Sequence, residues 1–173
     1  KVQRIQEEKE AQYLEQLGSE PTAPVCLQMY SCIEKYSKKY RVPRHVAYNV
    51  AFRETRYQGP FHWKYNPSQT SSAGALGPMQ IMPSTANLIE GKAISKHKLK
   101  NDVEYNVKLS MRLLRILYNK YGNWKLVFGA YNTGRPIINK YAIKVFNYDI
   151  PWTTEAVNNT TTLPGNSFIK GGM

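Results

Sequence analysis

Apolar residues recur every three to four positions in several segments of this chain, and glycine or proline separates the segments. The clearest run lies between Val25 and Tyr40, with apolar side chains at positions 25, 29, 33, 36 and 40. Residues with this spacing lie on one face of an α-helix and can pack against a core. The pattern predicts a mainly α-helical fold, with room for one short β-hairpin in the loop-like region 59–80.

Proline and glycine mark the expected ends of the other helices, because proline suits the first turn of a helix and glycine the position after its last. The expected helices begin near Pro43, run from Pro83 to Gly91, from Asp102 to Tyr121 and from Trp124 to Gly134, and begin again at Pro136. Residues 92–100 are rich in lysine and are expected to form a basic connection.

The length of 173 residues suits one compact domain with additional sequence at its ends. Residues 1–20 are charged and predict an N-terminal helix or tether, residues 21–150 carry the periodicity of a globular domain, and residues 151–173 read as a polar C-terminal tail. The start at Lys1 is compatible with a removed signal peptide or anchor and also with a fragment. Cys26 and Cys32 lie about 9 Å apart along a helix, which is too far for a disulfide.

The formal net charge of +12 predicts attraction to polyanions. Nucleic acid, an anionic membrane and the acidic bacterial wall all qualify by charge alone. A nucleic-acid partner is not expected, because no reader motif is recognisable in the sequence. No metal is expected either, because His45, His62 and His97 complete no ligand pattern with the two cysteines.

Three segments carry the functional signal. They are residues 51–57 (AFRETRY), 71–86 (SSAGALGPMQIMPSTA) and 129–134 (GAYNTG). In this order they resemble the soluble-type (family 1) lytic transglycosylases, which belong to the lysozyme-like superfamily and are related to goose-type lysozyme. Residues 102–107 and 121–124 resemble two further family segments, so the resemblance covers residues 42–146.

The resemblance implies a lysozyme-like α domain with a cleft for glycan strands. Enzymes of this kind cleave the β-1,4 bond between N-acetylmuramic acid (MurNAc) and N-acetylglucosamine (GlcNAc) without adding water, and they leave a 1,6-anhydro ring. They use no cofactor and no metal. The implied partner is peptidoglycan. The implied location is the cell envelope, either periplasmic or exported, where a membrane tether or a larger assembly could hold the domain. If the source is a phage, the implied location is the virion.

Glu54 is the candidate catalytic residue. It continues the apolar stripe of Val46, Ala47, Val50 and Ala51, and burial of a carboxyl group raises its pKa. A protonated Glu54 can donate to the leaving oxygen and then, as a carboxylate, take the proton of the attacking C6 hydroxyl. Two-carboxylate glycosidases need a second acid, and the matched motifs contain none.

The resemblance also implies roles for residues outside the first motif. Ser71 is expected to contact Glu54 or the acetamido group of the substrate, and Gly77 to allow close approach of the backbone. Gln80 and Met82 are expected in the groove wall. Tyr131 is expected to orient Glu54, and Asn132 to fix the geometry of its motif.

The sequence departs from the family at three places. Pro78 replaces the usual leucine and lacks a backbone N–H, and Ser110 replaces a glycine that is frequent in the long helix. The stretch between Glu54 and Ser71 is longer than usual. It contains an aromatic cluster, from which we predict that Trp63 or Tyr65 stacks on a sugar ring.

Two other functions fit the same motifs. A goose-type lysozyme would hydrolyse the same bond with water, and an inactive lysozyme-like module could dock on the wall as part of a phage or secretion machine. The sequence does not separate bacterial wall remodelling, phage entry and secretion.

Overall fold

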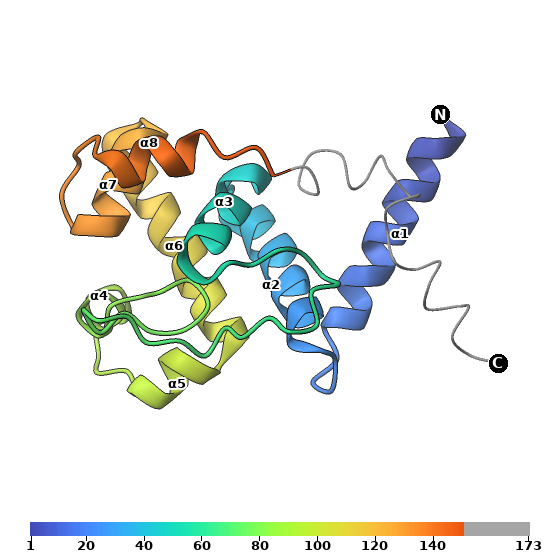
Figure 1. The fold of residues 1–173 in the computed structure, drawn as a ribbon, viewed down its shortest axis with the longest axis horizontal. Coiled ribbons are helices and arrows are strands. Elements are labelled where there is room, and N and C mark those ends of the chain that lie inside the picture. Colours follow the sequence, from blue (N-terminus) through green and yellow to red (C-terminus); the bar gives the residue numbers. More distant parts are fainter. Residues whose placement is uncertain (151–173) are drawn as a thin grey trace.

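A computed structural model describes residues 1–150 of the chain, which form eight helices (Figure 1). They are α1 (Val2–Gly18), α2 (Val25–Lys39), α3 (Arg44–Thr55), α4 (Pro83–Glu90), α5 (Lys96–Asn101), α6 (Val103–Tyr121), α7 (Trp124–Thr133) and α8 (Lys140–Phe146). The predicted mainly α-helical class is confirmed. The predicted polar tail, residues 151–173, lies outside the described residues.

Helix α6 runs through the middle of the molecule and separates two groups of elements (Figure 1). Its buried side chains Val107, Met111 and Leu114 join residues of α2, α3, α7 and α8 in the main hydrophobic core. A smaller core lies on another side of α6, where Leu109 packs with Leu76 and Leu99 from the loop and from α5. The long helix therefore holds the loop region 59–82 and the C-terminal helices in one body.

Local signals placed the ends of α4, α6 and α7 correctly. Asp102 caps α6 by accepting a hydrogen bond from the Tyr105 backbone N–H at 2.9 Å. Gly91, Gly122 and Gly134 follow the three helices in the left-handed conformation, which glycine adopts without steric cost.

The predicted start of the last helix at Pro136 is wrong, because α8 begins only at Lys140. Asn139 caps it by accepting from the Ala142 N–H at 2.8 Å. The preceding segment instead packs directly on α7, where a Cβ on Gly129 would lie 1.7 Å from the Ile137 carbonyl oxygen. This close approach holds residues 135–139 outside a helix.

The basic connection predicted for residues 92–100 is also corrected. Ser95 accepts a hydrogen bond from the Lys98 N–H, and the short helix α5 follows it. The possible hairpin in residues 59–80 is reduced to two isolated bridges, Thr70 with Leu76 and Leu76 with Ile81, and no longer strand forms within residues 1–150.

Helix α1 is anchored at its C-terminal end and projects away from the body at its N-terminal end (Figure 1). Gly18 lies so close to α2 that a Cβ would meet the Leu27 carbonyl oxygen at 2.2 Å. The Ser31 hydroxyl donates to the Glu15 carbonyl oxygen at 2.8 Å, and Lys38 pairs with the Glu15 carboxylate at 2.7 Å. None of the helices in residues 1–150 is both long and apolar enough to cross a membrane.

Candidate active site

Glu54 lies in the last turn of α3, beyond the fully buried Val50 and Ala51. Burial raises the pKa of its carboxyl to about 7, against the weaker opposing effects of a hydrogen bond from Tyr141 and the charge of Arg53. Neither Arg53 nor Arg56 forms an ion pair with this carboxylate in the described part of the chain. A carboxyl with this pKa holds its proton near neutral pH in about half of the molecules.

The hydroxyl that contacts Glu54 belongs to Tyr141 of α8, which donates to Glu54 Oε1. Tyr141 is itself buried, and the Arg53 guanidinium lies 5.4 Å from the centre of its ring. Sequence reasoning missed this residue, because it lies outside the three segments that carry the functional signal. It is the single hydrogen-bond partner of the Glu54 side chain in residues 1–150.

Two asparagines bring α8 to this position. Asn49, on α3, donates to the Val145 carbonyl oxygen at 2.9 Å and ties the two helices together. The capping residue Asn139 donates to the Asn132 side chain at 3.1 Å, which fixes the start of α8 against the end of α7. Asn132 therefore acts on the position of Tyr141 through the cap of α8.

Side chains from three helices fix the loop that faces Glu54. Thr55 donates to the Pro78 carbonyl oxygen at 2.7 Å, and Tyr131 donates to the Met79 carbonyl oxygen at 2.6 Å. Asn106 accepts from the Met79 N–H at 3.0 Å and donates to the Leu76 carbonyl oxygen at 2.9 Å. The loop is thus held by bonds to its backbone, and the missing N–H of Pro78 leaves these contacts intact.

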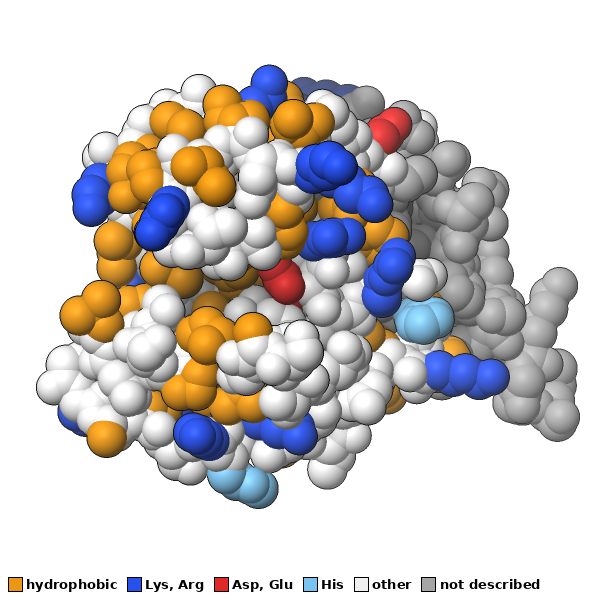
Figure 2. Space-filling model, turned by 60° about the vertical axis from the view of Figure 1, so that its left-hand side comes forward, with side chains coloured by type: hydrophobic (Ala, Val, Ile, Leu, Met, Phe, Trp, Pro, Cys, Tyr) orange, Lys and Arg blue, Asp and Glu red, His pale blue; other side chains and the backbone are white. Residues whose placement is uncertain are grey.

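The face of the molecule that contains the loop and the C-terminal helices is hollowed (Figure 2). Figure 2 shows one acidic side chain within this hollow, apolar side chains on both of its walls, and several Lys and Arg side chains to its upper right. A hollow with apolar walls and a positive border suits an extended ligand with sugar rings and acidic groups.

The family model of the transglycosylase SLT domain matches residues 31–150. The chain belongs to the transglycosylase SLT family. This family consists of peptidoglycan-degrading proteins of the lytic transglycosylase type within the lysozyme-like superfamily. No solved structure matches the chain with significance.

In the SLT domain, Ser71 and Gly77 shape the central loop. The Ser71 hydroxyl accepts from the Ala75 N–H at 3.0 Å and closes a turn. Gly77 has a φ of +78°, and a Cβ at this position would lie 2.5 Å from Asn106 Nδ2 and 2.6 Å from the Leu99 carbonyl oxygen. Any larger residue at position 77 would displace Asn106, which holds the loop.

Gln80 and Met82 follow in the same loop. Gln80 has a φ of +53°, and its side-chain amide donates to the Gly77 carbonyl oxygen at 2.9 Å and to the Gln69 carbonyl oxygen at 3.2 Å. The amide nitrogen therefore supports the loop, while the side-chain oxygen is free to accept a ligand hydrogen bond. Met82 is 38% exposed at the start of α4 and can contact a ligand.

The direct orienting role expected for Tyr131 is corrected, because its hydroxyl bonds to Met79 and, at 2.9 Å, to Ser110. Burial and the charge of Glu54 raise the Tyr131 pKa, so the two groups are close without being hydrogen-bonded. Ser110 thus supplies a hydroxyl that a glycine could not supply.

The aromatic loop separates into two kinds of residue. Tyr65 is 6% exposed and its hydroxyl bonds to Thr55 at 2.7 Å, so a sugar cannot stack on it in this conformation. Trp63 is 49% exposed and packs edge to face with Phe61. Its predicted stacking on a sugar stays a prediction.

Proposed function

We propose that this SLT domain is a lytic transglycosylase that cleaves the MurNAc–β-1,4–GlcNAc bond of peptidoglycan and leaves a 1,6-anhydro end. The observation that carries the proposal is the buried carboxyl of Glu54, with its pKa raised to about 7 and its hydrogen bond from Tyr141. A carboxyl with an ordinary pKa would have lost the proton that the leaving oxygen needs.

The first step uses Glu54 as an acid. Its proton passes to the glycosidic oxygen, the bond from C1 of MurNAc to that oxygen breaks, and GlcNAc leaves as an alcohol. The acetamido oxygen of MurNAc supports the positive charge that develops at C1. The Glu54 carboxylate formed in this step is stabilised by the Tyr141 hydroxyl and by the charge of Arg53.

The second step uses the same residue as a base. The C6 hydroxyl of MurNAc attacks C1 and gives its proton to the Glu54 carboxylate, which restores the acid. No water is consumed, and the proton lent in the first step is returned in the second. One carboxyl group is sufficient for this cycle, and the groups that shift the Glu54 pKa include no second carboxylate among residues 1–150.

A peptidoglycan substrate implies that the domain acts in the cell envelope, either in the periplasm or after export, or that it acts as part of a virion. A membrane tether or a larger envelope or virion assembly would bring the domain to the glycan. The net charge of +12 supports attraction to the acidic wall.

The test is mass spectrometry of the fragments that the protein releases from purified peptidoglycan. We expect wild type to release muropeptides with 1,6-anhydro ends, which are lighter by one water than fragments with reducing ends. Glu54→Gln should release neither. Reducing ends from wild type would identify a hydrolase of the goose-type lysozyme kind, and no release from a folded wild type would identify a docking module.

A further inference from the structure

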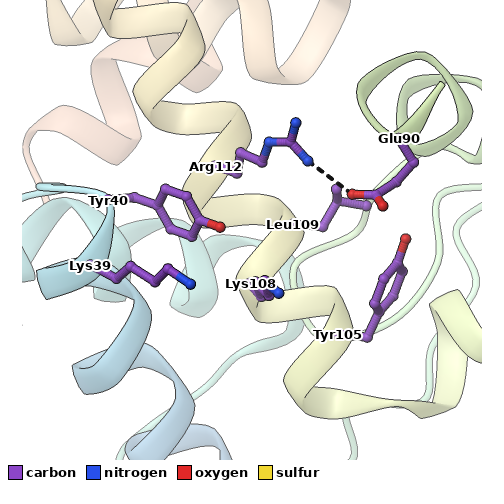
Figure 3. A pocket seen from close by; sticks show the side chains of 7 residues that line it. All are labelled: Lys39, Tyr40, Glu90, Tyr105, Lys108, Leu109 and Arg112. Carbon is purple, nitrogen blue, oxygen red and sulfur yellow. Dashed lines mark hydrogen bonds and ion pairs between the residues drawn. The ribbon is translucent and has the colours of Figure 1, made fainter.

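A second concavity lies on the opposite side of α6 from the loop-holding residue Ser110. It has a volume of about 190 Å³ and is formed by the end of α2, the end of α4 and the outer face of α6 (Figure 3). Its lining residues are Lys39, Tyr40, Glu90, Tyr105, Lys108, Leu109 and Arg112. None of them belongs to the proposed glycan site.

The lining has three cations and one carboxylate, which leaves an excess of two positive charges. Glu90 is already paired with Arg112 at 3.1 Å. Lys39 and Lys108 form no ion pair with any carboxylate of residues 1–150. Figure 3 shows the Lys39 side chain from α2 pointing toward Lys108 of α6.

The nearest acid outside the pocket does not neutralise this excess. Lys108 lowers the pKa of Glu104, but only as the weakest of the groups that act on it. Glu104 instead accepts hydrogen bonds from Tyr36 at 2.6 Å and from Lys35 at 3.2 Å. The ammonium group of Lys108 therefore remains available to a ligand.

Helix α6, which carries Lys108, also brings an unsatisfied hydroxyl to the pocket lining. The Tyr105 hydroxyl is out of contact with solvent and has no hydrogen-bond partner in the described structure. Such a group destabilises the protein until a partner is found. A ligand with an acceptor oxygen beside Glu90 and Lys108 would satisfy it after a small side-chain rotation.

The surrounding sequence adds to the positive field. Residues 105–148 contain eight lysines and arginines and no aspartate or glutamate. This stretch covers nearly all of α6 and the whole of α7 and α8. Glu104 is the one carboxylate on these three helices, so an anion approaching them meets mainly positive charge.

We propose that this pocket binds a phosphate group. Two ammonium groups and a hydroxyl, one from α2 and two from α6, line the pocket, which suits the several acceptor oxygens of a phosphate. A planar carboxylate would be served best by a free guanidinium group, and the guanidinium of Arg112 already binds Glu90. The volume admits a phosphate with a small organic substituent.

The test is thermal unfolding of the full chain in phosphate, compared with chloride at the same ionic strength. At a phosphate concentration ten times the Kd, we expect Tm to rise by about 3–6 °C. The double variant Lys39→Ala/Lys108→Ala should lose the rise. The matched control Lys96→Ala/Lys120→Ala removes two exposed lysines outside the pocket and should keep it.

Three ligands identify the source of the phosphate group. Inorganic phosphate represents a free anion, glycerol 3-phosphate represents a monoester, and a short poly(glycerol phosphate) represents a diester in a polymer. Tyr105→Phe should weaken the binding of whichever is tightest by about three- to tenfold. An equal rise of Tm in the pocket variant and wild type, or no rise in wild type, would overturn the proposal. The result does not depend on catalysis by Glu54, because no substrate is cleaved in the measurement.

Discussion

Glu34 and Glu54 are carboxyl groups on neighbouring helices, and they have different surroundings. Glu34 on α2 accepts from Arg44 at 2.5 Å and from the Tyr48 hydroxyl at 2.8 Å, with Lys38 4.0 Å away. Glu54 on α3 accepts from Tyr141 alone and has no ion pair among residues 1–150. Both lie on helices of the main core, and Glu54 is the more exposed of the two, so depth of burial does not explain why its pKa is the one that is raised.

The difference lies in the partners. A buried carboxylate with a cation in contact contributes to the structure and loses much if either partner is removed. A buried carboxyl without such a cation keeps its proton to a higher pH, and this proton is available for transfer. Glu34 is therefore a structural residue, and we propose Glu54 as the reactive one.

The largest effect is expected on activity. Glu54→Gln should lower the rate of wall cleavage by about 10³-fold, because the amide cannot donate or accept the transferred proton. Glu34→Gln, compared per folded molecule, should leave the rate within a few-fold of wild type. Release of soluble fragments from purified peptidoglycan measures both, and equal losses in the two variants would remove the distinction.

The second prediction concerns stability. Glu34→Gln should lower the free energy of unfolding by about 3 kcal/mol, because Arg44 keeps its charge in a half-buried position without its counter-ion. Urea denaturation at pH 7 gives this value. A loss below about 0.5 kcal/mol would show that the ion pair contributes little to the fold.

The third prediction uses the sign of the Glu54 pKa shift. Between the ordinary value of 4.5 and about 7, the unfolded chain loses this proton while the folded chain keeps it, so stability falls as pH rises through this range. The Glu54→Gln variant has no carboxyl at this position, so its stability should not fall in this pH range for this reason. The substitution should stabilise the protein by about 2–3 kcal/mol above pH 8 and hardly at pH 4. A pH-independent difference between the two proteins would contradict the assignment.

The smallest effect is expected from Tyr141→Phe. The hydrogen bond from Tyr141 lowers the Glu54 pKa, so its removal should move the alkaline limb of the rate profile to higher pH. The maximal rate should fall about tenfold, because the carboxylate formed after proton transfer loses its donor. Tyr131→Phe is the matched comparison, since its hydroxyl bonds to the loop instead. Tyr131→Phe should lower the stability of the fold without shifting the alkaline limb of the rate profile.

The parts of the fold that local chemistry decides could be predicted from the sequence. Asp102, Gly91, Gly122 and Gly134 act within one turn of their helices, and the ends that they predict are confirmed. Pro136 is the counterexample. Its local signal for a helix start was overridden by the packing of Ile137 on Gly129 and by the cap at Asn139.

In the candidate site, too, only the features that the local sequence decides could be predicted. The apolar stripe before Glu54 predicted its burial, and the structure places the residue in a half-buried position. Tyr141 could not be found in this way, since it is one of 13 tyrosines and lies 87 positions from Glu54. The bond from Asn49 to the backbone of α8 and the bond from Asn139 to Asn132 bring the two together. The prediction that a sugar ring could stack on Tyr65 failed for a similar reason. An aromatic residue in a loop gives no sign that its hydroxyl will be buried and hydrogen-bonded to Thr55.

The two thiols of α2 have a consequence for where this chain can operate. Cys26 and Cys32 are both free, and burial raises the pKa of each, that of Cys32 to about 12. Almost no thiolate forms at neutral pH, so oxidants and disulfides find little to react with. We therefore expect both thiols to stay reduced when the chain passes from a reducing to an oxidising compartment.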